Sequence, residues 1–357
     1  MSLEKAINNN SIRAVDLFCG AGGLTRGMIN AGIDVVAGFD VDFQCKFPFE
    51  FNNRAKFIEK DVSVLEPGEI RTHLGHEQYT VLAGCAPCQP FSTYSRSTQK
   101  KKPERDKRWD LLTSFEHLVS SLVPDFVTME NVPGLEDQKV FKDFVKRLKK
   151  LHYFVDYKLI YCPDYGLAQT RKRLVLVAGL NHKVVIPPPS HKKSQYKTVK
   201  DVISHLPSIK AGEFLTSDPL HRSSKLSEQN LRRIQASAPG GTWLDWPEEL
   251  RAECHKKSSG ETYLGVYGRM KWDEPSSTIT TQFNGYGNGR FGHPEQDRAI
   301  SLREAALLQS FPENYQFFSD PSNIGLGHIA RMIGNAVPVL LGELVGKVIV
   351  DAVNSDI

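Results

Sequence analysis

The sequence lacks the features that mark membrane and secreted proteins. Its 357 residues contain no apolar run of membrane-spanning length, and the first ten are polar, without the apolar core of a secretory signal. The cysteines are irregularly spaced and do not predict a disulfide framework. They are Cys19, Cys45, Cys85, Cys88, Cys162 and Cys254. We therefore expect a protein of a reducing, cytoplasmic setting that does not associate with a membrane.

Motifs for common cofactors and metals are scarce as well. The chain has one CxxC pair, Cys85 and Cys88, and a structural zinc site would need a second pair, so we expect no metal. Pro90 and the polar run after it do not predict the helix that follows a redox CxxC, which disfavours a redox role. The glycine-rich turn after the first predicted strand is G-x-G-G, and it is neither a Walker A loop nor a G-x-G-x-x-G turn, which argues against a nicotinamide or flavin oxidoreductase.

What is present is an alternation of short apolar runs and helical patterns, which predicts an α/β fold. Strands are predicted over residues 13–18, 35–39, 56–59, 79–83, 125–129, 153–161 and 174–180. From about residue 183 this periodicity is lost, and Ser, Gly, Trp and basic residues become frequent. We predict a catalytic, cofactor-binding domain over 11–182 and a small irregular domain over 183–275. The return segment over 276–357 ends in a helix that completes the catalytic domain.

A glycine-rich turn and two acidic residues predict a nucleoside site. The run from Cys19 to Gly23 joins the first strand to a helix, so a ligand can approach the backbone at the positive end of that helix. Asp40 ends the second strand about twenty residues later, where a carboxylate can accept ribose hydroxyls. Asp61 follows the third strand. The alternative is a tight structural turn with solvated loop acids.

A stiff loop presents Cys88 after a buried strand. Pro87 and Pro90 keep the backbone on both sides of Cys88 out of helix, just beyond the carboxyl edge of the sheet, where α/β enzymes place their chemistry. The loop continues into residues 93–108, which hold seven basic and two acidic residues. A basic loop beside a reactive thiol favours a polyanionic substrate. The alternatives are an inert buried cysteine and a merely solvated charge run.

Five short motifs occur in order along the chain. They are DLFCGAGGL at Asp16–Leu24, PCQPFS at Pro87–Ser92, ENV at Glu130–Val132, QTRKR at Gln169–Arg173 and GNAVP at Gly334–Pro338. In this order they resemble the motifs of the DNA cytosine-5 methyltransferases of bacterial restriction-modification systems. The segment 183–275 falls where that family carries its variable target-recognition domain.

The resemblance implies a Rossmann-like methyltransferase fold with a mixed, mostly parallel sheet, and S-adenosyl-L-methionine as methyl donor. The cofactor-binding positions carried over from the family are Phe18, Gly20, Ala21, Gly22, Gly23, Asp40, Val41, Asp61, Val62, Pro87, Leu111, Asn335 and Val337. The sequence departs from the family at three places. Asp40 stands where Glu is usual, Val41 stands where a large aromatic is common, and Cys85-Ala86 replaces Gly-Pro. We expect slightly weaker cofactor binding, retained activity, and a second thiol at Cys85 that is open to artefactual oxidation.

The resemblance also implies the catalytic residues. Cys88 would add to C6 of cytosine, and Glu130 would present a proton or hydrogen bond at N3. Arg173 and Arg171 would supply positive charge at O2 and near the thiolate. Because a stacked base is out of reach, the target cytosine must be flipped out of the duplex. The predicted DNA-binding residues are Ser92, Arg96, Lys100, Lys101 and Arg108.

The expected partner is double-stranded DNA, bound by a monomer. A cognate restriction endonuclease of the same system is expected to act separately, without a stable complex. Two alternatives remain. One is a cytosine-5 tRNA methyltransferase of the same fold, which the long distinct insert disfavours. The other is a non-catalytic DNA-binding module, against which the intact set of Cys88, Glu130, Arg171 and Arg173 argues.

Overall fold

The computed structural model describes residues 11–75, 77–87, 109–253, 255–256, 263–320 and 325–355. The chain divides into two compact units. The larger unit comprises Met1–Ile160, Lys172–Pro188 and Val337–Ile357, and the smaller unit comprises Tyr161–Arg171 and Pro189–Ala336. Among the described residues, no helix is both long and apolar enough to cross a membrane.

A seven-stranded sheet in the order β3-β2-β1-β4-β5-β7-β6 forms the centre of the larger unit. The strands are β1 (Ile12–Leu17), β2 (Asp34–Asp40), β3 (Lys56–Glu59), β4 (Tyr79–Gly84), β5 (Phe126–Asn131), β6 (Tyr153–Tyr161) and β7 (Lys172–Leu180). The first five strands are parallel to one another, and β7 runs antiparallel to β5. The carboxyl ends of β1, β2, β3, β4 and β5 therefore meet at one edge of the sheet.

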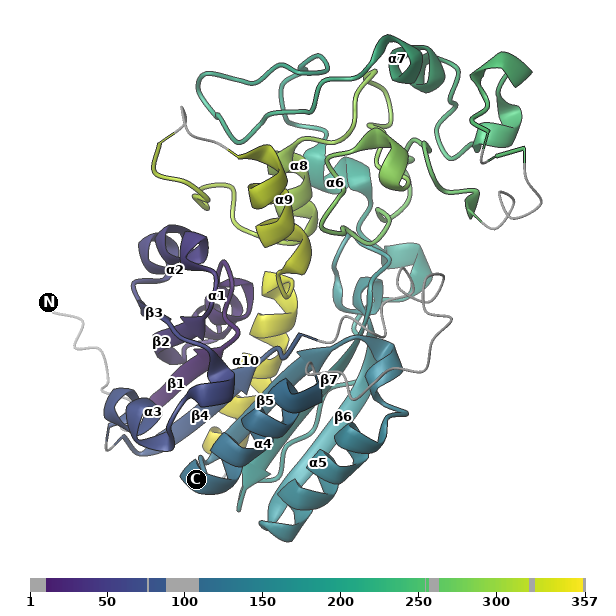
Figure 1. Ribbon diagram of the computed structural model, residues 1–357. Helices are drawn as coiled ribbons and strands as arrows, with labels where there is room; N and C mark the ends of the chain where they lie inside the picture. The colour runs from purple at the N-terminus through teal and green to yellow at the C-terminus, as the bar shows by residue number, and fades with distance from the viewer. Residues whose placement is uncertain are drawn as a thin grey trace, which may run out of the picture. The chain divides into compact units, whose positions relative to one another are not determined.

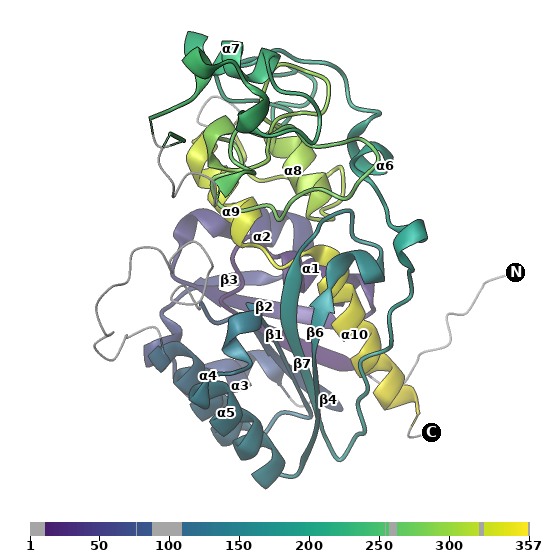
Figure 2. The same ribbon diagram turned by 90° about the vertical axis from the view of Figure 1, so that its right-hand side faces the viewer.

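Helices cover both faces of this sheet (Figures 1 and 2). One face carries α3 (Pro67–Leu74), α4 (Trp109–Leu122) and α5 (Lys139–Lys150), and the other carries α1 (Gly23–Asn30) and α10 (Val339–Asn354). A short helix, α2 (Lys46–Asn53), lies beside α1 and β3. A Cβ atom on Gly27 would lie 2.2 Å from the carbonyl oxygen of Val339, so glycine is what lets α1 and α10 pack backbone against backbone. The C-terminal helix thus completes the larger unit.

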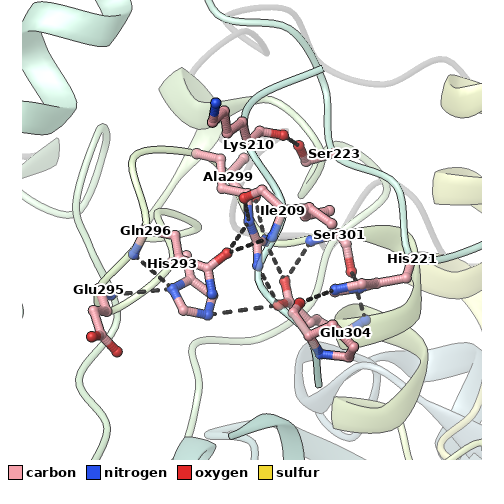
Figure 3. A network of polar contacts seen from close by, with 12 residues as sticks. Ile209, Lys210, His221, Ser223, His293, Glu295, Gln296, Ala299, Ser301 and Glu304 are labelled. Atoms are coloured by element: carbon pink, nitrogen blue, oxygen red, sulfur yellow. Dashed lines mark hydrogen bonds and ion pairs between the residues drawn. The ribbon is translucent and has the colours of Figure 1, made fainter. Parts of the chain in front are cut away.

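The smaller unit has little regular structure and is held by buried polar groups. Its helices are α6 (Val199–Ile203), α7 (Glu228–Gln235), α8 (Leu302–Leu308) and α9 (Leu326–Asn335). Glu304 lies at the centre of a network in which Arg298 donates to both of its oxygens at 2.7 Å and the amide of Ser301 donates at 2.6 Å (Figure 3). Burial would raise the pKa of Glu304, but Arg298 outweighs it and lowers that pKa to about 2.

His293 packs against the same carboxylate as a neutral imidazole. Burial lowers its pKa to about 4, and its Nδ1 accepts hydrogen bonds from the amides of Glu295 and Gln296. On the other side of Glu304, His221 contacts Ser301 and the carbonyl of Pro207 (Figure 3). This network joins segments that are far apart in the sequence, and it takes the place of regular secondary structure in holding the smaller unit together.

The predicted fold class and all seven predicted strands are confirmed, with shifts at their ends. The first strand ends at Leu17 rather than at Phe18, because Phe18 has a left-handed backbone with φ 58°. β5 extends through Asn131, so Glu130 lies within the strand. The run from Ser301 to Glu304 predicts a capping box that opens a helix through Ser310. The capping box is present, but α8 ends at Leu308 because Ser310 is left-handed, with φ 61°.

The compact units differ from the predicted segments in three respects, two of which are that Tyr161–Arg171 belongs to the smaller unit and residues 183–188 belong to the larger one. Residues 276–336, which we grouped with the return segment, belong to the smaller unit together with 189–275. Compactness does not test which residues recognise DNA, so a target-recognition role for 183–275 stays a prediction.

Candidate active site

The turn after β1 and the end of β2 form one hydrogen-bonded cradle. The amide of Gly20 donates to Oδ2 of Asp40 at 2.9 Å, and the amide of Asp42 donates to Oδ1 at 2.9 Å. Gly22, at φ 87°, caps α1, and the left-handed Phe18 opens the turn. Burial raises the pKa of Asp40, while these amides counteract the shift. A Cβ on Gly20 would meet nothing within 4 Å, so the backbone here is open to a ligand.

The end of the next strand, β3, contributes further residues to this cradle. Asp61 follows β3 and caps a 3-10 turn (Val62–Val64) through the amide of Ser63 at 2.8 Å. The side chain of Val62 is buried, whereas that of Val41 is 63% exposed. Strand pairing thus brings together the predicted cofactor residues of β1, β2 and β3. These residues fit a nucleoside with an adjoining chain, because carboxylates, open backbone amides and an apolar floor occur in one place.

Asp16 is a buried carboxylate that the sequence analysis did not assign to the site. It lies in β1 and is 1% exposed. The hydroxyl of Thr25 donates to its Oδ2 at 2.7 Å, and its Oδ1 has no hydrogen-bond partner among the described residues. Burial, with Asp40 adding to it, raises the pKa of Asp16 to about 7. Only the fold reveals that the Asp16 carboxylate is buried, because the motif alone does not show which side chains are shielded from water.

We expect Asp16→Asn to stabilise the cofactor-free protein increasingly as the pH rises. The folded-state pKa of Asp16 is about 7, above its ordinary value of 3.8, so the folded carboxyl favours its neutral form. The stability this provides is complete below the unfolded value and is lost as pH rises through about 7, whereas Asn cannot ionise. Thermal unfolding should show Asn gaining about 1–3 kcal/mol relative to Asp between about pH 5 and about pH 8. A difference independent of pH would contradict this expectation.

The loop that leads from β4 to Cys88 is held at two points. The amide of Cys85 donates to the carbonyl of Leu17 at 3.3 Å, and the side-chain amide of Asn131 donates to the carbonyl of Ala86 at 2.9 Å. Ala86 is buried, and Pro87 is exposed. Cys88 and the predicted DNA-binding residues lie outside the described residues. Those residues are Ser92, Arg96, Lys100, Lys101 and Arg108. The described part of this loop, which ends at Pro87, is therefore held at Cys85 and Ala86.

Glu130 and Arg173 come together where β5 and β7 pair. The carboxylate of Glu130 is 4% exposed, and its Oε1 lies 2.7 Å from Nε of Arg173. The antiparallel register places Asn131 opposite Leu174, which brings the end of β5 beside the start of β7. The thiol of Cys85 lies 3.0 Å from the other oxygen, Oε2. The sequence analysis gave Cys85 no role, although its position after β4 was a usable signal, because β4 and β5 are neighbours.

Arg171 lies in the smaller unit, while Arg173 belongs to the larger one. Arg171 is 3% exposed and donates to the carbonyls of Ile279 at 3.2 Å and Ala336 at 3.4 Å. Gln169 is also buried and binds the backbone at Ile279 and Leu308. The first part of this motif therefore ties together distant segments of the smaller unit, and Arg173 at its end pairs with Glu130. Leu111 and Val337 lie in the larger unit and Asn335 in the smaller.

Comparison with known proteins gives close relatives over the whole chain. The sequence matches the C-5 cytosine-specific DNA methylase family over residues 12–351. It is 51% identical over 336 residues to the type II methylase M.HgiDII of Herpetosiphon aurantiacus, covering 93% of each chain. It is 30% identical to the type II methyltransferase M.Sau96I of Staphylococcus aureus, over 97% of this chain and 77% of that protein. A solved Escherichia coli protein encoded within a prophage shares the fold, with TM-score 0.72 and 23% identity over 96% of this chain and 100% of that one.

The sheet order, with its antiparallel β7, is that of the S-adenosylmethionine-dependent methyltransferase fold. Within that class, the chain belongs to the C-5 cytosine-specific DNA methylase family. It is a DNA cytosine-5 methyltransferase that acts on double-stranded DNA, with S-adenosyl-L-methionine as its methyl donor.

Proposed function

We propose that the protein methylates one short DNA sequence through a covalent Cys88 adduct, with Glu130 and Arg173 acting on the target cytosine. The observation that carries this proposal is the buried Glu130, paired with Arg173 at 2.7 Å, beside the anchored loop that leads to Cys88. A buried carboxylate next to a guanidinium can give a proton or hydrogen bond to one base atom while positive charge faces another.

The chemistry needs each of these groups because C5 of cytosine is a poor nucleophile. The thiolate of Cys88 forms a bond to C6, and the displaced electron pair makes C5 nucleophilic. Glu130 gives a proton to N3 and so limits the negative charge that the addition creates, while Arg173 faces O2. When bound, S-adenosylmethionine supplies an electrophilic methyl group for C5. Loss of the C5 proton to a base then lets the bond between C6 and sulfur break, which restores the thiolate of Cys88, and the proton on N3 returns to Glu130.

The cradle at the carboxyl ends of β1, β2 and β3 is the proposed cofactor site. Phe18, Gly20, Ala21, Gly22 and Gly23 would contact the methionine and adenosine through open backbone, and Asp40 would accept the ribose hydroxyls. The adenine would lie against Val62 and Asp61, with Val41 on the outer side. Of the remaining predicted cofactor positions, Pro87, Leu111 and Val337 belong to the same unit as the cradle and would contribute to this pocket. Arg171, through its contacts with Ile279 and Ala336, would hold the Asn335 segment rather than touch the base.

Recognition of the target sequence is proposed for side chains of 183–275. A guanidinium that reads a base edge must be free to reach it. Arg269 is 5% exposed and donates to the carbonyls of Ile234, Ser237, His293 and Gln296, so it holds its own unit together. Arg233 is also buried and binds the carbonyl of Leu250, whereas its neighbour Arg232 on α7 is exposed. Arg232 is therefore the better candidate for base contact.

The curated relatives named above are type II enzymes of restriction-modification systems, and we propose the same setting here. The chain would act as a monomer that protects DNA against a separate cognate endonuclease. The basic segment with Ser92, Arg96, Lys100, Lys101 and Arg108 would clamp the phosphate backbone around the flipped cytosine.

A bisulfite map of DNA from cells that express the protein tests this division of labour. The wild type should methylate cytosine in one sequence context. Lys100→Ala combined with Lys101→Ala should lower methylation at all sites alike and reduce the slope of log affinity against log salt by about 2, because phosphate contacts carry no sequence information.

Arg232→Ala should relax the methylated context while the melting temperature stays unchanged. Arg233→Ala is the matched control on the same helix, and it should lower the melting temperature because a buried carbonyl loses its donor. A loop variant that changed the methylated sequence would contradict the proposal, and so would methylation of tRNA in preference to duplex DNA.

A further inference from the structure

We propose that Cys85 is a positioning residue for methyl transfer, whose thiol holds Oε2 of Glu130 so that Oε1 is the oxygen presented to cytosine. This inference rests on the catalytic role proposed for Glu130. Sequence analysis treated Cys85 only as a thiol open to artefactual oxidation, and the departure from Gly-Pro at this position had no assigned purpose.

The contact between Cys85 and Glu130 follows from strand pairing. β4 and β5 are parallel neighbours with Gly84 opposite Met129, so the residues that follow, Cys85 and Glu130, stand side by side. Their side chains meet with Sγ 3.0 Å from Oε2. The backbone of Cys85 is anchored to Leu17, and the next carbonyl, that of Ala86, is anchored by Asn131. These two hydrogen bonds therefore fix the position of the Cys85 thiol relative to the carboxylate of Glu130.

The thiol acts as the donor in this contact. Burial raises the pKa of Cys85 well above its usual value, and the charge and hydrogen bond of Glu130 raise it further, against the opposing effect of Arg173 and with a small addition from Asp16. Cys85 therefore keeps its proton at neutral pH. Sγ is therefore the donor and Oε2 of Glu130 is the acceptor in this contact.

The two oxygens of Glu130 are consequently different. Oε1 lies close enough to Nε of Arg173 for an ion pair, but no N–H is aligned with it, so among the described residues it accepts no directed hydrogen bond. Arg173 instead directs a terminal N–H at the carbonyl of Lys172 at 2.8 Å. A proton on Oε2 would face the S–H of Cys85, so protonation is directed to Oε1. A carboxylic acid with one oxygen already held presents its proton in one direction, which is what transfer to N3 requires.

The competing explanation is that Cys85 only fills space beside β5. Alanine and serine at this position separate the two explanations. Serine is smaller than cysteine but keeps a donor, whereas alanine removes the donor. If packing were the whole role, both variants would lower the melting temperature and leave the pH dependence of methyl transfer unchanged.

The test is single-turnover methylation of duplex target DNA by the full chain, with saturating cofactor and reductant, from about pH 6 to about pH 9. We expect Cys85→Ala to lower the rate roughly tenfold and to move the alkaline limb of the rate profile upward by about half a pH unit or more, because the S–H no longer favours the ionised carboxylate. Cys85→Ser should stay within about threefold of wild type and keep its profile. DNA affinity should be unchanged in both variants.

Combination with Glu130→Gln separates this inference from the proposed function. In an enzyme that already carries Glu130→Gln, Cys85→Ala should have little further effect on rate, since the group that it positions is already lost. A Cys85→Ala variant with the wild-type rate and profile, or alanine and serine variants impaired alike, would overturn the positioning role. If instead Glu130→Gln itself kept normal turnover, the proposed function of Glu130 would fail.

Discussion

Duplex DNA with 5-fluorocytosine at the target position is expected to stay attached to the protein through denaturation when cofactor is present. Fluorine at C5 cannot leave as a proton does, so the bond between C6 and sulfur does not break after methyl transfer. Cys88→Ser should abolish this trapped complex and reduce methylation of normal DNA to background. A shifted band on a denaturing gel, confirmed by the mass of the modified peptide, measures the result.

Cys85→Ser is the matched control for the trapping experiment, since the two thiols are three positions apart. It should form the trapped complex, because the serine hydroxyl keeps the donor that Glu130 needs and the change does not touch the nucleophile. Attachment of DNA through Cys85 would show that the wrong thiol has been assigned as nucleophile.

Glu130→Gln is expected to lower single-turnover methylation by roughly two to four orders of magnitude. Glutamine keeps the size and hydrogen-bonding reach of the side chain but cannot give up a carboxyl proton. Affinity for DNA and for cofactor should change little, because the ground-state contacts largely persist. Rate, affinity and melting temperature measured on the same preparation separate a catalytic loss from a folding defect.

Glu136→Gln is a suitable control, since it makes the same chemical change six residues later, beyond the 3-10 turn Pro133–Leu135. It should leave the rate near that of wild type. Near-normal turnover of the Glu130→Gln enzyme would remove Glu130 from the catalytic residues.

The structure also bears on the alternative that Glu130 merely caps the turn after β5. The amide of Val132 donates its hydrogen bond to the side chain of Asn131, at 2.9 Å. The contacts of Glu130 are instead with Cys85, directly after β4, and with Arg173 on β7. A selective loss of turnover in Glu130→Gln, with stability retained, is therefore the expected pattern.

Much of the fold could be predicted because its strands are short, apolar and bounded by turn residues. The runs that form β2, β3 and β6 were predicted within one residue at each end, since local side-chain patterns determine where a buried strand starts and stops. The ends that shifted have local causes that composition does not reveal. Phe18 and Ser310 adopt left-handed backbones, which only the surrounding packing enforces.

By itself, the sequence determined the class of chemistry. Cys88 between two prolines, the glycine turn with Asp40, and the order of five motifs depend on residue identity and spacing, and these are visible in the chain. The tertiary structure decided which contacts neighbouring residues make. Arg173 contacts Glu130 while Arg171, two residues away, holds backbone carbonyls.

Pairing and burial likewise placed Asp16 and Cys85 beside their partners, which the sequence motifs alone do not show. The physical reason is that desolvation and hydrogen bonding across strands depend on which segments meet, as Thr25 meets Asp16 and Cys85 meets Glu130. A sequence records these partners 9 and 45 residues apart, and only the folded sheet makes them neighbours.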